Sequence, residues 1–231
     1  MSPDWFEPIR NYCERTGPDF WAEPVNAATN GAFLVAALLA ARRAAEAPAD
    51  RPCLALAALT GIVGIGSFLF HTLAVRWSML ADVIPIALFI YGYFWLAMRR
   101  FLGLGMGAAI GVTAAFLGLS FGLTPALDAL AGRSLADLSN GSIDYLPAIL
   151  ALAGVAAALL LSPAPMRARR EAGLRLLAVA GLFLASLTAR TIDRSICASA
   201  PLGTHWLWHL LNAGVLYALI AAAVRFRRAG A

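Results

Sequence analysis

The chain has 231 residues, of which 61% are hydrophobic and 13% are charged, and its formal net charge is +5. Soluble domains are usually about 45–50% apolar and about 25% charged, so this composition excludes an ordinary water-soluble globule and long disordered segments. It also argues against nucleic acid as a partner, in spite of the basic balance. The composition therefore predicts a protein that lies in a membrane.

Seven stretches have the roughly 20 mostly apolar residues that a helix needs to cross a bilayer. We expect spans at residues 24–43, 53–74, 79–98, 101–122, 143–162, 172–191 and 204–225, with the polar run 124–142 connecting the fourth span to the fifth. This predicts an all-α membrane protein, a seven-transmembrane helix bundle. Residues 1–23 form an extracytoplasmic head, 24–226 the transmembrane domain and 227–231 a cytoplasmic tail. The head is acidic and has no apolar core, so it is not a signal peptide.

The arginines predict the orientation, because cytoplasmic loops carry an excess of basic residues. Twelve arginines fall on one side and six on the other; the six are Arg10, Arg15, Arg76, Arg133, Arg190 and Arg194. The N-terminus is therefore expected outside and the C-terminus inside. A chain rich in Ala, Gly and Leu, with arginine but no lysine, is typical of GC-rich bacterial genomes, so we expect a multi-pass protein of a bacterial inner membrane.

Polar residues within the spans fall at one level, near the outer side. The second span ends with Ser67 and His71, the third begins with Asp82, and the seventh begins with His205 and His209. The first span begins with Glu23, Asn26 and Asn30. Because ionisable residues inside a membrane are costly, they indicate a functional site.

The spacing of the histidines favours a metal. His205 and His209 are four residues apart, so both lie on one helix face. With His71 they make the three histidines of the chain, the ligand set of a catalytic zinc, which lowers the pKa of a bound water. Asp82 is then placed to take a proton from that water or to orient a ligand.

Simpler interpretations stand beside this one. A single intramembrane His or Asp often only hydrogen-bonds to a neighbouring helix, and we expect that role for Asn26 and Asn30. Two of the histidines could instead bind a haem, although that leaves Asp82 unexplained. Ser67 could be a small residue at a close helix contact.

The head and the cysteines leave two questions open. The oxygen-rich run Asn11, Glu14, Thr16, Asp19 and Glu23 could bind Ca²⁺, or it could be a solvated acidic segment. Cys13 and Cys197 both lie on the side where disulfides persist, and they can be bridged or free. Cys53 lies on the other side and is expected to be a free thiol.

Together these residues resemble the alkaline ceramidase family, seven-span hydrolases related to the adiponectin receptors. The shared pattern covers nearly the whole chain. It comprises YCE and AEPVNAATN at the start, GSFLFH followed by Asp82-x-x-Pro85, Asp193-x-x-x-Cys197, and HWLWH. The spacing Ser-x3-His-x10-Asp, together with His-x3-His on the last span, is specific.

The resemblance implies site residues. Zinc is bound by His71, His205 and His209, water is activated by Asp82, and Ser67 lies near the metal. Tyr145 corresponds to an active-site tyrosine and Trp208 to a substrate-binding tryptophan. A calcium site maps onto Asn11, Tyr12 (through its carbonyl), Glu14, Thr16 and Glu23, and a disulfide onto Cys13 and Cys197. The family's eukaryotic members have Asp in place of Asn11 and Asn in place of Thr16. Fewer anionic ligands weaken calcium binding unless Asp19 compensates.

The resemblance implies hydrolysis of a lipid amide, ceramide to sphingoid base and fatty acid, with an N-acyl amino-acid lipid as the alternative substrate. Tyr145 or Ser67 would donate to the developing oxyanion. Two other classes compete with this function. One is a zinc-stabilised lipid receptor without turnover, and the other is a proton-coupled transporter. The inner halves of the spans hold almost no ionisable residues, which argues against the transporter. The oligomeric state is not predicted.

Overall fold

The computed structural model describes residues 4–46, 48–162 and 167–229; residues 1–3 of the expected head and 230–231 of the expected tail lie outside the described residues. The described part of the chain is helical and contains no β-strand. Its helices are α1 (Pro24–Thr29), α2 (Gly31–Ala45), α3 (Arg51–Leu73), α4 (Arg76–Arg100), α5 (Met106–Ala131), α6 (Leu135–Leu138), η1 (Ser142–Tyr145), α7 (Leu146–Leu160), α8 (Arg167–Ile192), η2 (Asp193–Ile196) and α9 (His205–Ala229).

Seven helical segments of the described chain are long and apolar enough to cross a membrane. They are Pro24–Ala45, Arg51–Leu73, Arg76–Arg100, Met106–Ala131, Ser142–Leu160, Arg167–Ile196 and His205–Ala229. Each one contains most of a predicted span. The predicted all-α, seven-span fold is therefore confirmed.

The first and fourth spans differ from the sequence prediction. The first span is divided at Asn30 into α1 and α2. The fourth span does not end near residue 122, because α5 continues through Pro125 to Ala131 before Gly132 adopts a positive φ of 66°. The residues after Pro125 are mostly Ala and Leu, which favour helix. The helix therefore continues beyond the end that the length of the apolar stretch predicts.

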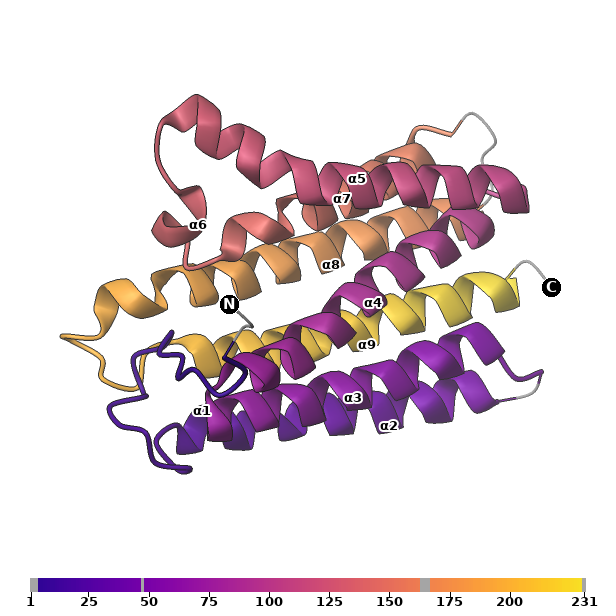
Figure 1. Cartoon of the computed structure of the whole chain (residues 1–231). Coiled ribbons are helices and arrows are strands. Elements are labelled where there is room, and N and C mark those ends of the chain that lie inside the picture. Colours follow the sequence, from indigo (N-terminus) through magenta and orange to yellow (C-terminus); the bar gives the residue numbers. More distant parts are fainter. Residues whose placement is uncertain (1–3, 47, 163–166, 230–231) are drawn as a thin grey trace.

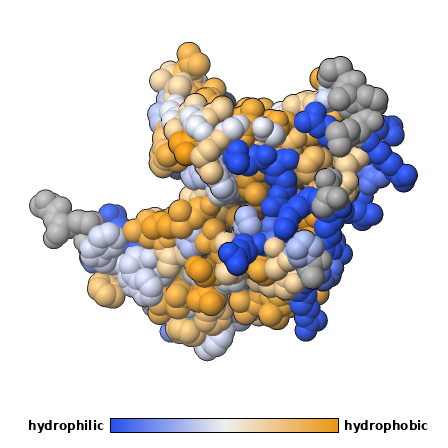
Figure 2. All heavy atoms as spheres, turned by 90° about the vertical axis from the view of Figure 1, so that its right-hand side faces the viewer, coloured by the Kyte–Doolittle hydropathy of each residue, from blue (hydrophilic) through white to orange (hydrophobic). Residues whose placement is uncertain are grey.

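The helices run side by side as a bundle with two different ends (Figure 1). We call the end that carries residues 4–23 and the first turn of α9 the head end, and the end that carries the C-terminus the tail end. At the tail end, Arg228 pairs with Glu46 at 2.6 Å and donates to the Arg43 carbonyl at 2.8 Å. Figure 2 looks onto this end and shows hydrophilic side chains gathered on part of it, beside apolar flanks.

Close packing of α3 against α4 sets the level of two candidate residues. A methyl group at Gly66 would overlap the backbone carbonyl of Ala81 and come within 3.2 Å of the Asp82 nitrogen. Small residues let membrane helices approach this closely, where hydrophobicity alone gives little association. The contact brings the next residue, Ser67, to the same level as Asp82.

The helices of the bundle differ in how much of their surface is buried by their neighbours. In α9, 61% of the apolar membrane-spanning segment is buried inside the bundle, whereas in α5 only 11% of it is buried. The two helices with the histidines, α3 and α9, are also the two with the most buried residues of the described chain. The site is therefore carried by the helices that the bundle holds most firmly.

Candidate metal centre

The three histidines meet at the head end of the bundle. His71 comes from the last turn of α3, and His205 and His209 come from the first two turns of α9. One ligand atom of each lies within 4.8 Å of the others, and all three side chains are at most 1% exposed. Among the described residues this group has the ligands and spacing that could hold a metal ion.

Hydrogen bonds outside the cluster orient two of the rings. The Nδ1 atom of His71 lies 2.6 Å from Glu23 Oε2, and Nδ1 of His209 lies 2.9 Å from the Thr29 hydroxyl. The Nε2 atoms of these two rings face each other at 3.1 Å. Metal-binding histidines use the same arrangement, in which one nitrogen is fixed by a carboxylate or hydroxyl and the other is left for the ion.

Two buried polar atoms beside the cluster have no hydrogen-bond partner in the described structure, His205 Nδ1 and Asp82 Oδ1. Because a buried polar atom without a partner is costly, each one indicates a missing partner. A metal ion and its ligands would supply it. The donor set, the burial and these free atoms therefore fit a zinc ion.

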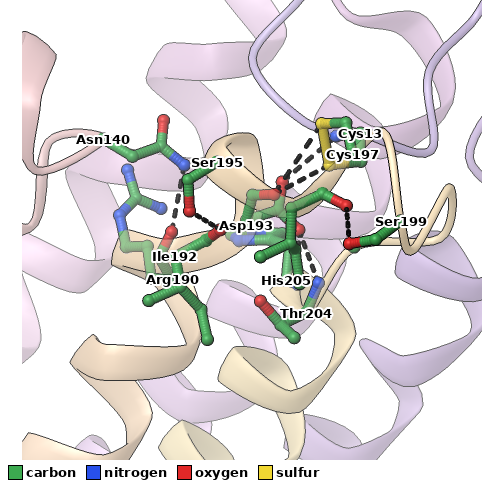
Figure 3. The surroundings of a disulfide bond; sticks show 12 residues. Cys13, Asn140, Arg190, Ile192, Asp193, Ser195, Cys197, Ser199, Thr204 and His205 are labelled. Atoms are coloured by element: carbon green, nitrogen blue, oxygen red, sulfur yellow. Dashed lines mark hydrogen bonds between the residues drawn. A yellow bond between two sulfur atoms is a disulfide. The ribbon is translucent and has the colours of Figure 1, made fainter.

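Asp193 binds the backbone at His205 (Figure 3), and Tyr12 packs against the His205 ring. The buried Asp193 carboxylate accepts from the backbone nitrogens of Thr204 at 2.7 Å, His205 at 2.9 Å and Cys13 at 3.1 Å. A carboxylate at a helix N-terminus satisfies free N–H groups and the helix dipole. Gly203, with φ of 62°, is required here, because a Cβ would collide with the Asp193 side chain. The Tyr12 ring stacks on His205 with 3.5 Å between ring centres.

Glu23 connects the cluster to the head. Its side chain is buried and contacts His71, Arg15 Nε at 2.5 Å and Asn26 Nδ2 at 3.1 Å. Burial alone would raise the pKa of Glu23, but the interactions with His71 and the hydrogen bonds from Arg15 and Asn26 outweigh it and hold this pKa below its ordinary value. Glu23 is thus an ionised acceptor for the His71 ring.

The two carboxylates among the five residues expected to bind calcium are engaged with other groups in this structure. The Glu14 carboxylate accepts from the backbone nitrogens of Val25 and Asn26 at 2.7 and 2.8 Å and so caps α1. The Glu23 carboxylate is paired with Arg15, and Thr16 is exposed. Calcium requires six to eight oxygen ligands, so the Glu14 and Glu23 carboxylates would have to exchange these partners to bind the ion.

The Arg15 guanidinium is buried in the head and makes several hydrogen bonds there. It is 3% exposed, and it donates to the carbonyls of Gly17, Asp19 and His71 at 3.2, 3.3 and 2.9 Å. Together with its pairing to Glu23, these bonds tie the head to the last turn of α3.

Asn26 and Asn30 differ from the interhelical bonds expected of them. Asn26 Nδ2 donates to Glu23, and Asn30 Nδ2 donates to the Asn26 carbonyl at 2.9 Å, within the same span. The reason is local: Asn26 lies on the short helix α1 and Asn30 follows it directly, so the preceding acid and the α1 carbonyls are within reach.

Ser67, Asp82 and Tyr145 lie around the cluster on different elements. Ser67 is buried one turn before His71 on α3, and Asp82 is half-buried on α4. Tyr145 ends η1 and packs against Trp208 with 5.2 Å between ring centres.

An apolar cavity between α4, α5, α7, α8 and α9 begins at Tyr145. Its lining includes Phe89, Phe94, Phe116, Tyr145, Phe183 and Leu216. Trp208 is buried beside Tyr145 but is not among the lining residues. The cavity has the chemistry of a site for a hydrocarbon chain.

The disulfide joins Cys13 of the head to Cys197 after η2, two residues that are 184 positions apart in the sequence (Figure 3). It closes the head over the first turn of α9. Cys53, near the tail end of α3, is a free and buried cysteine.

The sequence assigns no role to Arg15 and Arg190 beyond the orientation signal that they share with the other arginines at the head end. The available signal was their surroundings: Arg15 stands in an acidic head, and Arg190 stands in an apolar span, where a charge indicates a function. Asp193 belongs to the motif Asp193-x-x-x-Cys197, but its capping role depends on the loop that brings Thr204 to it.

The comparisons agree with this geometry. The family model described as Ceramidase matches residues 8–229, nearly the whole chain. No curated protein matches the chain.

Proposed function

We propose that this chain, which belongs to the ceramidase family, cleaves the amide bond of ceramide by means of a zinc ion held by His71, His205 and His209. The family makes the protein an amidohydrolase of ceramide-like lipids. The single observation that carries the zinc is the buried histidine cluster, in which two Nε2 atoms face each other while their Nδ1 atoms are fixed from outside.

The bound ion supplies Lewis-acid activation of a water and of the amide carbonyl. Around it, Glu23 and Thr29 hold the His71 and His209 rings in the required orientation. Asp193 and Tyr12 hold His205. These four contacts are made before substrate arrives, so the ligand set is preorganised.

Asp82 acts as the proton carrier. Its free Oδ1 atom accepts a proton from the attacking water as the water oxygen bonds to the carbonyl carbon. The carboxylic acid then returns this proton to the amide nitrogen as the carbon–nitrogen bond breaks. The products are a fatty acid and an amine. Ser67 or Tyr145 donates a hydrogen bond to the carbonyl oxygen as it gains negative charge.

The acyl chain occupies the apolar cavity that begins at Tyr145. This path suits a substrate that is already in the membrane, because the chain can pass from lipid to cavity without crossing water. Trp208 supports the Tyr145 ring from behind and so shapes the entrance.

The head end faces the outside in this proposal, and the tail end faces the cytoplasm of a bacterial inner membrane. Six arginines lie toward the head end and twelve toward the tail end. The disulfide lies at the head end and the free Cys53 near the tail end, which is the distribution expected across an oxidising and a reducing side. Residues 1–23, 24–226 and 227–231 then correspond to head, catalytic domain and cytoplasmic tail.

The test is ceramide hydrolysis by the purified protein in lipid nanodiscs, with zinc measured by mass spectrometry. We expect about one zinc per chain, loss of turnover after chelation, and recovery on adding zinc. His71→Ala should lose both zinc and turnover, whereas Thr60→Ala, at a buried position on the same helix, should keep both. Full hydrolysis by zinc-free protein, or by His71→Ala, would overturn the proposal.

A further inference from the structure

Arg190 is a charged residue near the metal centre that the proposed mechanism does not use. It lies in the last turn of α8, three residues before Asp193 (Figure 3). None of the ion pairs among the described residues includes it. A charge at this depth that makes no close ion pair is costly, and such residues mark substrate sites.

Aromatic rings surround the guanidinium. Its Cζ atom lies 5.8 Å from the ring centres of Tyr12 and Tyr145 and 5.4 Å from that of Trp208. Tyr12 also stacks on His205, so its ring lies between the guanidinium and one of the three clustered histidines. Since Tyr145 lines the apolar cavity, the guanidinium is also one ring away from the proposed acyl site.

One edge of the guanidinium is free. Nη1 donates to the Tyr12 hydroxyl at 2.9 Å, whereas Nε is buried without a partner and Nη2 makes no hydrogen bond to the described residues. Nε and Nη2 form one planar edge with two parallel N–H groups, which is the geometry that binds a carboxylate through both oxygens.

The residue beside this edge has no side chain. Gly141, with φ of 73°, lies against the guanidinium, and a Cβ there would come within 3.2 Å of Nη2. Three carboxylates lie on neighbouring elements. Asp193 accepts three backbone N–H groups, Asp144 accepts from Thr124 at 2.9 Å, and Asp82 is close enough to act on Arg190 through its charge but makes no ion pair with it. Among the described residues, no carboxylate forms a hydrogen bond with Nε or Nη2 of Arg190.

We propose that the free edge of Arg190 can bind a carboxylate on the amine part of the lipid, so that the protein also hydrolyses N-acylated amino acids. The inference rests on the proposed function, because it names the head group for the same hydrolysis. Arg190 is a specificity residue: it contacts the head group while the histidines and Asp82 act on the amide.

The experiment compares two substrates that differ in one group. N-palmitoyl-serine carries a carboxylate where N-palmitoyl-serinol carries a hydroxymethyl group, and ceramide is assayed beside them. We expect the wild-type protein in nanodiscs to hydrolyse the serine compound with a kcat/KM at least tenfold higher. Arg190→Gln should bring the ratio close to one, mainly by slowing the serine compound. Arg190→Lys, which keeps the charge but not the planar edge, should fall between them.

The control is Arg194→Gln, which removes an exposed arginine four residues along the chain and should keep the wild-type ratio. Equal kcat/KM values for the two compounds in the wild-type protein overturn the inference, and this result needs no variant to fold. An equal loss on both compounds in Arg190→Gln also overturns it, because Arg190 would then support the metal site. Failure to hydrolyse all three lipids would instead contradict the proposed function.

Discussion

The two ends of the bundle each contain a buried carboxylate paired with an arginine. At the head end, Glu23 pairs with Arg15 at 2.5 Å, and at the tail end Asp50 pairs with Arg100 at 2.7 Å. Both carboxylates are about 3% exposed. The pairs differ in what else they touch, because Glu23 also contacts His71, whereas Asp50 caps α3 by accepting from Cys53 N at 3.4 Å. Similar chemistry thus orients a metal ligand at one end and fastens helices at the other.

Glu23→Gln tests this difference most strongly. The amide keeps the shape of the side chain but removes the charge that orients His71, and losses of this kind typically reduce metal affinity or activity about 10–100-fold. Ceramide turnover and zinc content should fall together. The matched change Asp50→Asn should leave turnover unchanged, and an equal loss of turnover in both variants would contradict the distinction.

Arg15→Gln should destabilise the protein whether or not calcium is present. Removing one partner of a buried pair leaves an uncompensated charge and costs about 3–5 kcal/mol. We expect a lower melting temperature in detergent, while Arg10→Gln, at an exposed position of the head, should melt like the wild type. The calcium chelator EGTA should not lower the wild-type melting temperature; a decrease that calcium reverses would show that the head does bind the ion.

The cysteines give a smaller contrast between the two ends. Replacing Cys13 and Cys197 by serine releases the head from η2, and disulfides typically contribute about 2–4 kcal/mol. Thermal unfolding should occur at a lower temperature, and reduction of the wild type should have the same effect. Cys53→Ala, at the other end, should not change the sensitivity to reductant; a reductant effect that persists in the double serine variant would point to another cause.

The tail-end pair should add a pH dependence to stability. Burial alone would raise the pKa of Asp50, but the hydrogen bond and charge of Arg100 outweigh it and lower this pKa. The contribution is therefore complete above the unfolded value of about 3.9 and is lost as the pH falls through the lower, folded value. The melting-temperature difference between wild type and Asp50→Asn should be constant from about pH 5 upward and should shrink below about pH 4. A difference that grows on acidification would contradict this sign.

Much of the candidate site could be predicted because it depends on position along the chain. Ser67, His71 and Asp82 lie at the ends of apolar stretches, and their depth follows from a rise of about 1.5 Å per residue. The pair His205 and His209 shares a face because of the helical period. The partners of the head could not be predicted in this way, since Arg15, Glu14 and Glu23 lie in an irregular segment whose path is fixed by long-range contacts.

The sequence by itself determined the seven spans, the level of the histidines and the family, because hydrophobic length and residue spacing are local properties. Only the tertiary structure decided which polar groups meet. Glu23 reaches both Arg15 and His71, Tyr12 stacks on His205, and Arg190 keeps one edge free. These contacts join residues up to about 190 positions apart, and they depend on how each helix is rotated about its axis. That rotation is set by packing against neighbouring helices, as at Gly66 and Ala81, and no spacing within one segment encodes it.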